Sequence, residues 1–411
     1  MTFRIAQMVK NMFRSTPGSI GVVTAFILFS LMLQSCASVP SRNAVPEEQV
    51  GRATVPGGSI ARMWGDQLPA DAEARFDLIR KQLRNNPDES VFTRPHYYLS
   101  ISGGGANGAF GAGLLKGWSE SGTRPEMTIV TGISTGALIA PFAFLGSDYD
   151  DRLEQLYTTL STTDLIKKRT LVGGLLSDAL ADTQPLRDLL QTQVDEEMVA
   201  AIAREFNKGR RLLIGTTNLD AKRPVIWNIG ALAVVGTEES TQLIRDVMLA
   251  SASIPGIFPP VRITVRVGDQ EYDELHVDGG VTSQVFLYPA QLDLREAAAT
   301  VGASGTQTVY VIRNSDLRPR WSAVEPRVLP VAATSISTLI RTQGMGDLYR
   351  IYLGATRDGI PYRLAYIPGD FDLEPDEEFD PQYMRTLFDL GYEMARDGYD
   401  WAESPPGISL E

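Results

Sequence analysis

The sequence predicts an α/β fold built around a mostly parallel sheet. From residue 97 onward, short β-prone apolar runs alternate with longer segments of helical periodicity, which is the pattern of α/β proteins. Two glycine-rich turns each stand between an expected strand and an expected helix. The chain has 411 residues, 43% of them hydrophobic, so it has enough material for one large or two modest domains.

The N-terminus has the features of an export signal. Basic residues precede an apolar run over residues 20–33, which has the length of a signal-peptide core and is short for a membrane span. The run leads into Leu33-Gln34-Ser35-Cys36. A leucine three positions before a cysteine, with a small residue directly before that cysteine, resembles the bacterial lipoprotein box.

This resemblance implies a signal peptide over residues 1–35, lipidation of Cys36 and, because Ala37 rather than aspartate follows, transport to the outer membrane of a Gram-negative bacterium. We therefore expect a lipoprotein of the cell envelope. The alternative is an uncleaved N-terminal anchor that faces the periplasm and carries an incidental cysteine. Because Cys36 is the only cysteine, an intrachain disulfide and a cysteine-rich metal site are excluded.

Composition divides the remainder of the chain into three parts. Residues 37–60 are rich in Ser, Pro, Val and Gly without periodicity, so we expect residues 36–90 to be a lipid-anchored tether and N-terminal extension, with a helix over 70–83. Residues 91–320 are expected to form the α/β domain. Residues 321–411 are expected to be a C-terminal helical region that completes the core.

The expected elements follow one another along the chain. Strands are expected over residues 97–101, 127–131, 211–216, 225–228, 261–267 and 308–313. Helices are expected over residues 106–121, 135–145, 148–159, 196–207, 239–250 and 381–396. The first two strands and the helix between them make one βαβ unit, so these strands should be parallel and joined by a right-handed crossover.

The first glycine-rich turn has two interpretations. Gly103, Gly105 and Gly108 spell G-x-G-x-x-G after a strand, as in a dinucleotide fingerprint. A dinucleotide site also needs an acidic residue at the end of the second strand, where this chain has Ser134. The nearest acid, Glu126, lies at the other end of that strand, which argues against a dinucleotide.

The second turn gives the first a different role. Ser134 is the centre of a G-x-S-x-G motif that runs from Gly132 to Gly136 between a strand and a helix, as in a nucleophile elbow. Both turns leave the same edge of a parallel pair, whose strands lie about 4.8 Å apart. The backbone amides of the first turn should therefore lie beside the Ser134 hydroxyl, where they would stabilise the oxyanion of an attacked acyl group.

The general base must be chosen from few candidates. The Ser–Asp/Glu–His order of an α/β-hydrolase is not available, because the chain has two histidines and none lies after His276. His96 precedes the first strand and is expected to be a surface or structural residue. Asp278 is a candidate, and His276 is its rival if a strand persists to residue 278, since both side chains would then share a face. The other interpretation of His276 is a strand residue near the surface.

Three signatures in this order resemble the patatin-like phospholipase family. They are the glycine-rich loop Gly103-Gly104-Gly105-Ala106-Asn107-Gly108, the elbow Gly132-Ile133-Ser134-Thr135-Gly136, and Asp278-Gly279-Gly280. The proline-rich segment at residues 251–261 adds to the resemblance. The family implies a three-layer α/β/α fold with a mostly parallel central sheet, and a catalytic domain over residues 91–320.

The resemblance also implies roles for residues. Ser134 would be the nucleophile and Asp278 the general base, with an oxyanion hole from Gly103, Gly104 and Gly105. The other motif glycines would support the turns; they are Gly108, Gly132, Gly136, Gly279 and Gly280. Asn107 departs from the family, many members of which have a basic residue there. Because a free aspartate has a pKa of about 3.9, either burial must raise the pKa of Asp278, or Asp278 must act in a transition state in which Ser134 and the oxyanion share the stabilisation.

The implied activity is a serine acyl hydrolase that cleaves fatty-acyl esters of phospholipids or related membrane lipids, without metal or organic cofactor. A general esterase, thioesterase or acyltransferase with the same dyad is the alternative; a non-catalytic envelope lipoprotein and a surface toxin or effector are others. The net charge of −12 argues against affinity for nucleic acid or for an anionic membrane surface through bulk electrostatics. The acidic stretch at residues 370–380 lacks the ligand spacing of a calcium loop and is expected to be a solvated surface.

Overall fold

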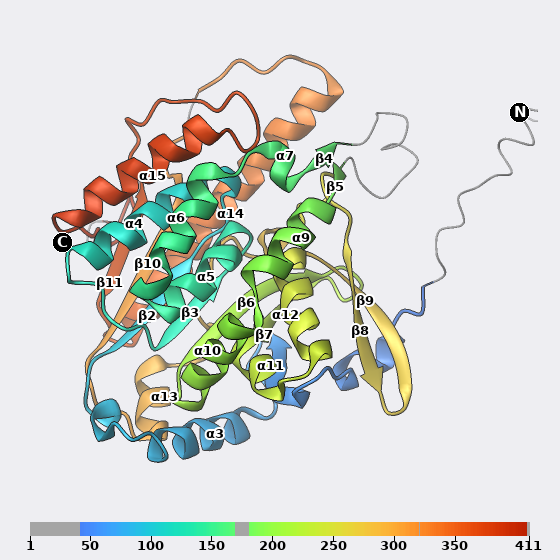
Figure 1. Ribbon diagram of the computed structural model, residues 1–411, viewed down its shortest axis with the longest axis vertical. Coiled ribbons are helices and arrows are strands. Elements are labelled where there is room, and N and C mark those ends of the chain that lie inside the picture. Colours follow the sequence, from blue (N-terminus) through green and yellow to red (C-terminus); the bar gives the residue numbers. More distant parts are fainter. Residues whose placement is uncertain (1–41, 169–180, 320, 409–411) are drawn as a thin grey trace, which may run out of the picture. The chain divides into compact units, whose positions relative to one another are not determined.

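The computed structural model describes residues 42–168, 181–319 and 321–408 (Figure 1). The chain divides into two units, Met1–Asn43 and Ala44–Glu411. The expected signal peptide and Cys36 lie outside the described residues. Within the described ranges, no helix combines the length and hydropathy that a membrane span requires.

A nine-stranded mixed sheet forms the centre of the second unit. Its strands are β1 (Arg62–Trp64), β2 (His96–Ile101), β3 (Ile129–Gly132), β6 (Arg211–Asn218), β7 (Arg223–Asn228), β8 (Val261–Val267), β9 (Gln270–Asp278), β10 (Gln307–Asp316) and β11 (Tyr362–Ile367). The strand order is β1-β7-β6-β3-β2-β10-β11, and β9 pairs with both β6 and β8. The five strands from β11 to β6 are mutually parallel, as the sequence predicts. β4 (Lys167–Lys168) and β5 (Ala181–Asp182) form a separate pair.

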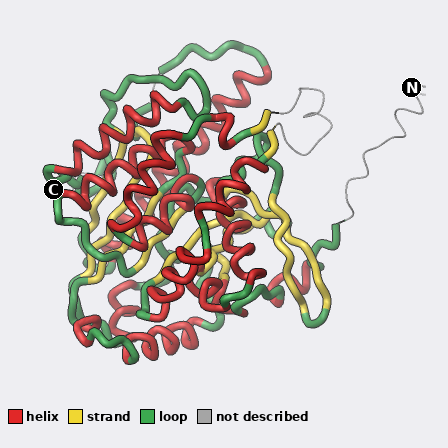
Figure 2. The backbone as a smooth tube through the Cα atoms, in the orientation of Figure 1, coloured by secondary structure: helices red, strands yellow, loops and turns green. Residues whose placement is uncertain are grey.

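Helices cover both faces of this sheet. The α-helices are α3 (Ala72–Arg84), α4 (Gly108–Glu120), α5 (Thr135–Leu145), α6 (Asp150–Thr159), α7 (Thr162–Leu165), α9 (Gln184–Gln193), α10 (Glu196–Asn207), α11 (Ile229–Val235), α12 (Glu238–Ser251), α13 (Leu294–Val301), α14 (Val328–Arg357) and α15 (Pro381–Arg396). Short 3₁₀ helices are η1 (Glu47–Arg52), η2 (Gly58–Ala61), η3 (Glu89–Phe92), η4 (Gly105–Asn107), η5 (Ser147–Tyr149) and η6 (Gly279–Val281). Figure 2 shows the strands enclosed between helices.

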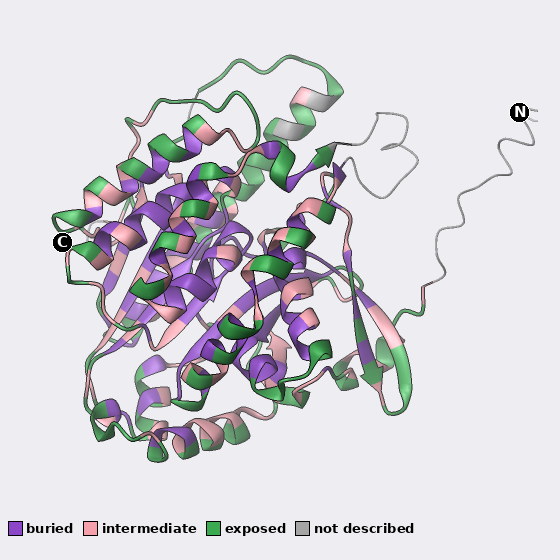
Figure 3. Ribbon diagram, in the orientation of Figure 1, coloured by how far each residue is buried: buried purple, intermediate pink, exposed green. Residues whose placement is uncertain are grey.

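Alternation along the strands creates two hydrophobic cores, one on each face. In β2, Leu99 and Ile101 join the core beneath α4, α5 and α15, whereas Tyr98 joins the core beneath α13 and α14. Successive strand residues point to opposite faces of a sheet, so an apolar run without polar alternation indicates a strand that is covered twice. The fold is therefore a three-layer α/β/α arrangement, and Figure 3 shows its sheet as predominantly buried.

Local sequence explains where several helices begin. The Asp195 side chain accepts a hydrogen bond from the amide of Met198 and caps α10, and Thr237 forms a capping box with Ser240 at the start of α12. Asp380 accepts from two amides at the start of α15, where Pro381 occupies the first turn. One acid of the stretch at 370–380 thus has a structural role as a cap.

The placement of β9 brings distant parts of the chain to one edge. β7 pairs along one side of β6, so β3 and β9 share the other side. β3 occupies that side as far as the pair Gly132–Ile214, and β9 follows with the pair Asp278–Thr216. The end of β9 consequently lies beside the turn that follows β3.

Three features of the fold differ from the sequence predictions. Residues from Ala44 onward belong to the compact unit, where β1 pairs with β7, so a tether that extends to about residue 60 is too long. The C-terminal region contributes β11 to the sheet and is not wholly helical. The first half of α14 is exposed and does not complete the core.

Candidate active site

Ser134 lies in a strained turn between β3 and α5. Its φ of 55° and ψ of −126° place a non-glycine residue in a conformation that side chains rarely adopt. A Cβ on Gly132 would overlap the Gly136 carbonyl group, and a Cβ on Gly136 would overlap the carbonyl oxygens of Ile101 and Ser102. The two flanking glycines are therefore required sterically, as the motif predicts.

A second serine holds the backbone of this turn. The amide of Ser134 donates to Oγ of Ser251 at 3.0 Å, and that hydroxyl donates to the Gly215 carbonyl oxygen at 2.7 Å. Ser251 is the last residue of α12 and is fully buried. The hydrogen bond satisfies an amide that a helix N-terminus leaves free, and it ties the turn to β6.

Asp278 is the last residue of β9 and is 5% exposed. Its amide donates to the Ser253 carbonyl oxygen, and its Oδ1 accepts from the Gly280 amide at 2.7 Å. Burial raises the pKa of Asp278 to about 7, although the Ser134 side chain and the Gly280 amide both act to lower that pKa. The structure thus brings the Ser134 hydroxyl within interaction range of a carboxyl group that titrates near neutrality.

The two glycines after Asp278 permit this close approach. A Cβ on Gly279 would contact the Gly215 carbonyl at 2.5 Å, and a Cβ on Gly280 would lie 2.8 Å from the Gln284 amide nitrogen and 2.9 Å from Asp278 Oδ1. Larger residues would push the carboxyl group away from the elbow.

The glycine-rich loop lies against the elbow. A Cβ on Gly103 would come within 3.1 Å of the Ser134 Cβ, so the loop backbone passes directly beside the nucleophile candidate. Gly105 has a φ of 58° and open space around its Cα hydrogens. A Cβ on Gly108, at the start of α4, would overlap the Thr135 hydroxyl, so that glycine lets α4 pack against α5.

One of the three predicted oxyanion donors is already in use. The Gly103 amide donates to the Gln284 carbonyl oxygen at 3.1 Å, because β2 and the segment after η6 run side by side there. The Gly103 amide, which the family resemblance assigns to the oxyanion hole, is therefore not free in this structure. Gly104 is exposed and Gly105 is half-exposed, so their amides are the remaining donors of this loop.

Asn314 supports the glycine loop and was not foreseen from sequence. This buried residue of β10 donates through Nδ2 to the Ser102 carbonyl oxygen and through its amide to the Ser102 hydroxyl, both at 2.9 Å. Its Oδ1 accepts from the Gly111 amide of α4 at 3.1 Å. The one side chain therefore fixes both ends of the loop. A polar residue at the carboxyl end of an expected parallel strand was the available signal.

The family model for patatin-like phospholipases matches residues 99–290. The chain carries a patatin-like phospholipase domain. The matched range contains the glycine loop, Ser134 and Asp278, and it supports a lipid hydrolase function. No curated protein shows a significant match to the chain.

Solved structures show distant similarity. VipD from Legionella pneumophila is 13% identical with a TM-score of 0.35, over 74% of this chain and 67% of that chain. Human GIVD cytosolic phospholipase A2 is 13% identical with a TM-score of 0.29, over 79% and 53%. Full-length ExoU in complex with SpcU, from the type III secretion system of Pseudomonas aeruginosa, is 13% identical with a TM-score of 0.24, over 74% and 52%. This chain thus spans between about half and two thirds of those chains.

In this patatin-like domain the His276 side chain belongs to a buried network of hydrogen bonds. Its Nδ1 lies 2.9 Å from the Thr216 hydroxyl, and its Nε2 lies 3.0 Å from Glu274, which forms a bidentate ion pair with Arg62. Trp227 donates to the same Thr216 hydroxyl. Burial lowers the pKa of His276, against the opposing effect of the Glu274 carboxylate. Both ring nitrogens have partners, and the expected location near the surface is wrong.

The other predicted polar residues take structural positions. His96 begins β2, at the opposite end of that strand from the glycine loop, and its Nδ1 lies 3.2 Å from the Thr128 hydroxyl. It is buried, so the structural alternative for His96 holds and the surface alternative does not. Asn107 accepts a hydrogen bond from the Tyr383 hydroxyl at 2.6 Å, which links the glycine loop to α15.

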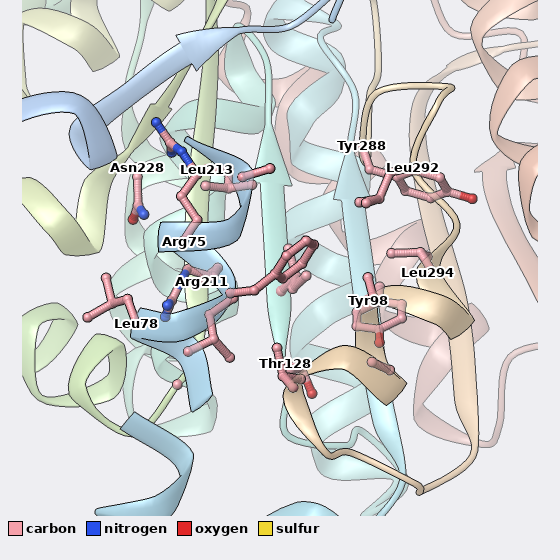
Figure 4. Close-up of a pocket in the computed structure, with 18 of the residues that line it drawn as sticks. Arg75, Leu78, Tyr98, Thr128, Arg211, Leu213, Asn228, Tyr288, Leu292 and Leu294 are labelled. Carbon is pink, nitrogen blue, oxygen red and sulfur yellow. The ribbon is translucent and has the colours of Figure 1, made fainter. Parts of the chain in front are cut away.

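Two cavities lie near the sheet. One of about 400 Å³ reaches Ile133 and Gly279, the neighbours of Ser134 and Asp278, and Arg350 of α14 lines its rim. A second, of about 230 Å³ and almost wholly apolar, lies between α3, α13 and the sheet (Figure 4). Ser134 and Asp278 are not among the described residues that line either cavity. Among the described residues, no group of three or more His, Cys, Asp or Glu could hold a metal ion.

Proposed function

We propose that this protein is a serine acyl hydrolase with a Ser134–Asp278 dyad. The observation that carries the proposal is a buried carboxyl group with a pKa near 7 beside a serine held in an elbow conformation. A base works best when its pKa lies near the operating pH, and the strained turn keeps the hydroxyl clear of neighbouring backbone.

The first half-reaction transfers the acyl group. The Ser134 Oγ attacks the ester carbonyl carbon while Asp278 accepts the hydroxyl proton. The amides of Gly104 and Gly105 stabilise the oxyanion. The C–O bond to the leaving alcohol then breaks, and Asp278 returns the proton to that alcohol oxygen. An acyl-serine and the deacylated alcohol remain.

The second half-reaction releases the acid. Asp278 accepts a proton from water as the water oxygen attacks the acyl-serine carbonyl, and the same amides stabilise the second oxyanion. The Ser134–acyl bond breaks and the serine oxygen regains its proton. The network on His276 stays outside both steps, because its ring nitrogens are occupied by Thr216 and Glu274.

The proposed substrates are fatty-acyl esters of phospholipids or related membrane lipids. Lipid products from purified protein and phospholipid vesicles, identified by mass spectrometry, test this directly. Release of free fatty acid and lysophospholipid by the wild type and not by Ser134→Ala is expected. Rapid turnover of short-chain esters or thioesters with intact phospholipid would instead identify a general esterase or thioesterase, and transfer of the acyl group to an added alcohol would identify an acyltransferase.

We also propose that the protein is a lipoprotein of the cell envelope, attached through lipid on Cys36. The proposal is supported by the basic start, the apolar run and the residues around Cys36. A tether would hold the enzyme at high effective concentration beside its substrate. Mass spectrometry of the N-terminal peptide of the mature protein tests this: a diacylglyceryl-modified Cys36 is expected, and an unmodified Met1 peptide contradicts it.

A further inference from the structure

The segment at residues 321–343, here named the α14 arm, is an apolar surface that no described part of the chain covers. Half of the large apolar side chains that are exposed among the described residues lie in this arm, seven of 14. Trp321 is 91% exposed, Val328 84% and Leu339 69%. In Figure 3 most of the described residues in the first turns of α14 are coloured as exposed. A concentration of apolar surface on this scale marks a binding surface for a partner or a membrane.

The apolar residues of the helical part follow helical spacing. Val328, Ala332, Ile336, Leu339 and Ile340 stand at i, i+4, i+8, i+11 and i+12 and therefore form one stripe. The opposite side carries Thr, Ser and Arg residues at positions 334, 337, 338 and 341. This is the pattern of a helix that lies in an interface, not of a helix that spans a membrane, in agreement with the hydropathy of the described helices.

Three hydroxyl groups of the arm donate hydrogen bonds to carbonyl oxygens of the same helix. Ser335 donates to the Val331 carbonyl oxygen and Thr338 to the Thr334 carbonyl oxygen, both at 2.7 Å, and Ser337 donates to the Thr334 carbonyl oxygen at 3.0 Å. Transfer of a hydroxyl group from water to an apolar medium is costly only when it lacks such a partner. Transfer of these three hydroxyl groups from water into an apolar medium should therefore cost little free energy.

Local charge distinguishes the arm from the rest of the protein. No acidic residue stands between Glu325 and Asp347, and of the two arginines in that interval Arg327 forms an ion pair with Glu325 at 3.5 Å, so Arg341 supplies the net positive charge of the arm. The whole chain carries a net charge of −12, but at physiological salt a charge acts over a Debye length of about 8 Å. The arm thus presents a neutral-to-basic surface, which favours anionic lipid head groups.

The remainder of α14 connects the arm to the candidate active site. Asp347 accepts hydrogen bonds from the amides of Gln284 and Val285, and the Gln284 carbonyl oxygen accepts from the Gly103 amide. Gln343 at the end of the arm, like Arg350, lines the cavity that reaches Ile133 and Gly279. The arm therefore ends at a cavity that reaches the chain neighbours of Ser134 and Asp278.

We propose that the α14 arm lies in the interfacial region of a phospholipid bilayer that contains anionic lipid, and that it presents the active site to that bilayer. The inference rests on the proposed function, and it names packed bilayer lipid as the form in which the substrate is met. Burial of one leucine changes partitioning by about 10- to 100-fold, so single substitutions in the stripe have measurable effects.

The single cysteine of the chain allows a direct test on the full protein. Leu339→Cys in a Cys36→Ser, Ser134→Ala background carries one thiol for an environment-sensitive fluorophore, and Val234→Cys, which replaces a 45% exposed residue outside the arm, is the matched control. Vesicles of phosphatidylcholine with phosphatidylglycerol should give a blue shift at position 339 and quenching by spin-labelled lipid, with neither at position 234. Vesicles of phosphatidylcholine alone should give a smaller change.

Each other outcome overturns the inference. An unquenched fluorophore at position 339 shows that the arm stays in water. A blue shift of the fluorophore at position 339 that occurs without vesicles and increases with protein concentration would show that the stripe binds a second copy of the chain. Because Ser134→Ala removes the nucleophile, these results do not depend on catalysis, and absence of hydrolysis by the wild type would overturn the proposed function alone.

A kinetic measurement supplies an independent readout. The ratio of the hydrolysis rate on vesicle phospholipid to that on a water-soluble ester should fall about 10-fold or more in Leu339→Asp and stay within twofold in Val234→Asp. Thermal unfolding checks that both variants fold, as expected for two exposed positions. An unchanged ratio in Leu339→Asp contradicts the inference.

Discussion

The carboxyl group of Asp278 should control the pH dependence of the reaction. Burial raises its pKa to about 7, against the opposing effects of Ser134 and the Gly280 amide. A general base accepts a proton only in its ionised form, so activity should fall as the pH falls through 7.

The size of the effect follows from the ionised fraction. With a pKa of about 7, roughly 1% of Asp278 is ionised at pH 5 and about 90% at pH 8. An aspartate with the ordinary pKa of about 3.9 would be more than roughly 90% ionised at pH 5. The value of kcat/KM at pH 5 should therefore be about one hundredth of its plateau, whereas an unperturbed base would lose less than about a tenth.

Unfolding driven by Asp278 does not account for such a loss. Its pKa is higher in the folded than in the unfolded state, so between about pH 4 and 7 the folded state binds more protons. The contribution of this group to stability is therefore favourable at low pH and is lost as the pH rises through 7. A shift of about three units corresponds to at most about 4 kcal/mol. Asp278→Asn should accordingly be at least as stable as the wild type at pH 8.

The assay is kcat/KM on a water-soluble ester between pH 5 and 9, with circular dichroism at each pH to verify the fold. A fall of about 100-fold from pH 8 to pH 5 agrees with a base of pKa near 7. Near-plateau activity at pH 5 in folded protein would refute the assignment of the base.

Three further substitutions test the support of the site. Gly104→Ala places a Cβ against the Asn314 carbonyl group and displaces the oxyanion amides, so kcat should fall about 100- to 1,000-fold while KM changes little; an unchanged kcat would exclude this loop from the oxyanion hole. Asn314→Ala leaves the Ser102 carbonyl oxygen and the Gly111 amide unsatisfied, and urea unfolding should show a loss of about 3 kcal/mol; a loss below about 0.5 kcal/mol would contradict its role as a clamp. His276→Ala breaks a buried network and should cost about 3 kcal/mol or more of stability, with labelling of Ser134 by a fluorophosphonate within about tenfold of wild type. An inactive, folded His276→Ala beside an active Asp278→Asn would reverse the assignment of the base.

The sequence predicts those parts of the site that local sterics determine. The elbow around Ser134 requires its flanking glycines because carbonyl groups lie where their side chains would be. The five-residue G-x-S-x-G motif, placed between a strand and a helix, is therefore sufficient to predict the elbow and its serine. The parallel pairing of β2 and β3 follows from the same local pattern, since one helix joins them.

Features that depend on distant segments were not predictable. Asp278 reaches Ser134 because β9 continues the edge of β6 where β3 ends, and no local pattern specifies that pairing. Asn314 supports a loop 212 positions away, and Ser251 binds an amide 117 positions away. The occupied Gly103 amide likewise depends on a carbonyl group from another segment. The exposure of the α14 arm was not predicted, because its sequence mixes apolar, hydroxyl and glycine residues. That sequence has the pattern of neither a core helix nor a membrane span.

The rate at which a fluorophosphonate modifies Ser134 tests the dyad most directly. Mass spectrometry should locate the adduct on the peptide that contains Ser134 in the wild type and in His276→Ala. In Asp278→Asn the rate should fall by about 100-fold or more, because the hydroxyl lacks its proton acceptor. Modification of Asp278→Asn at the wild-type rate, or an adduct on another residue, would contradict the proposal that Asp278 activates Ser134.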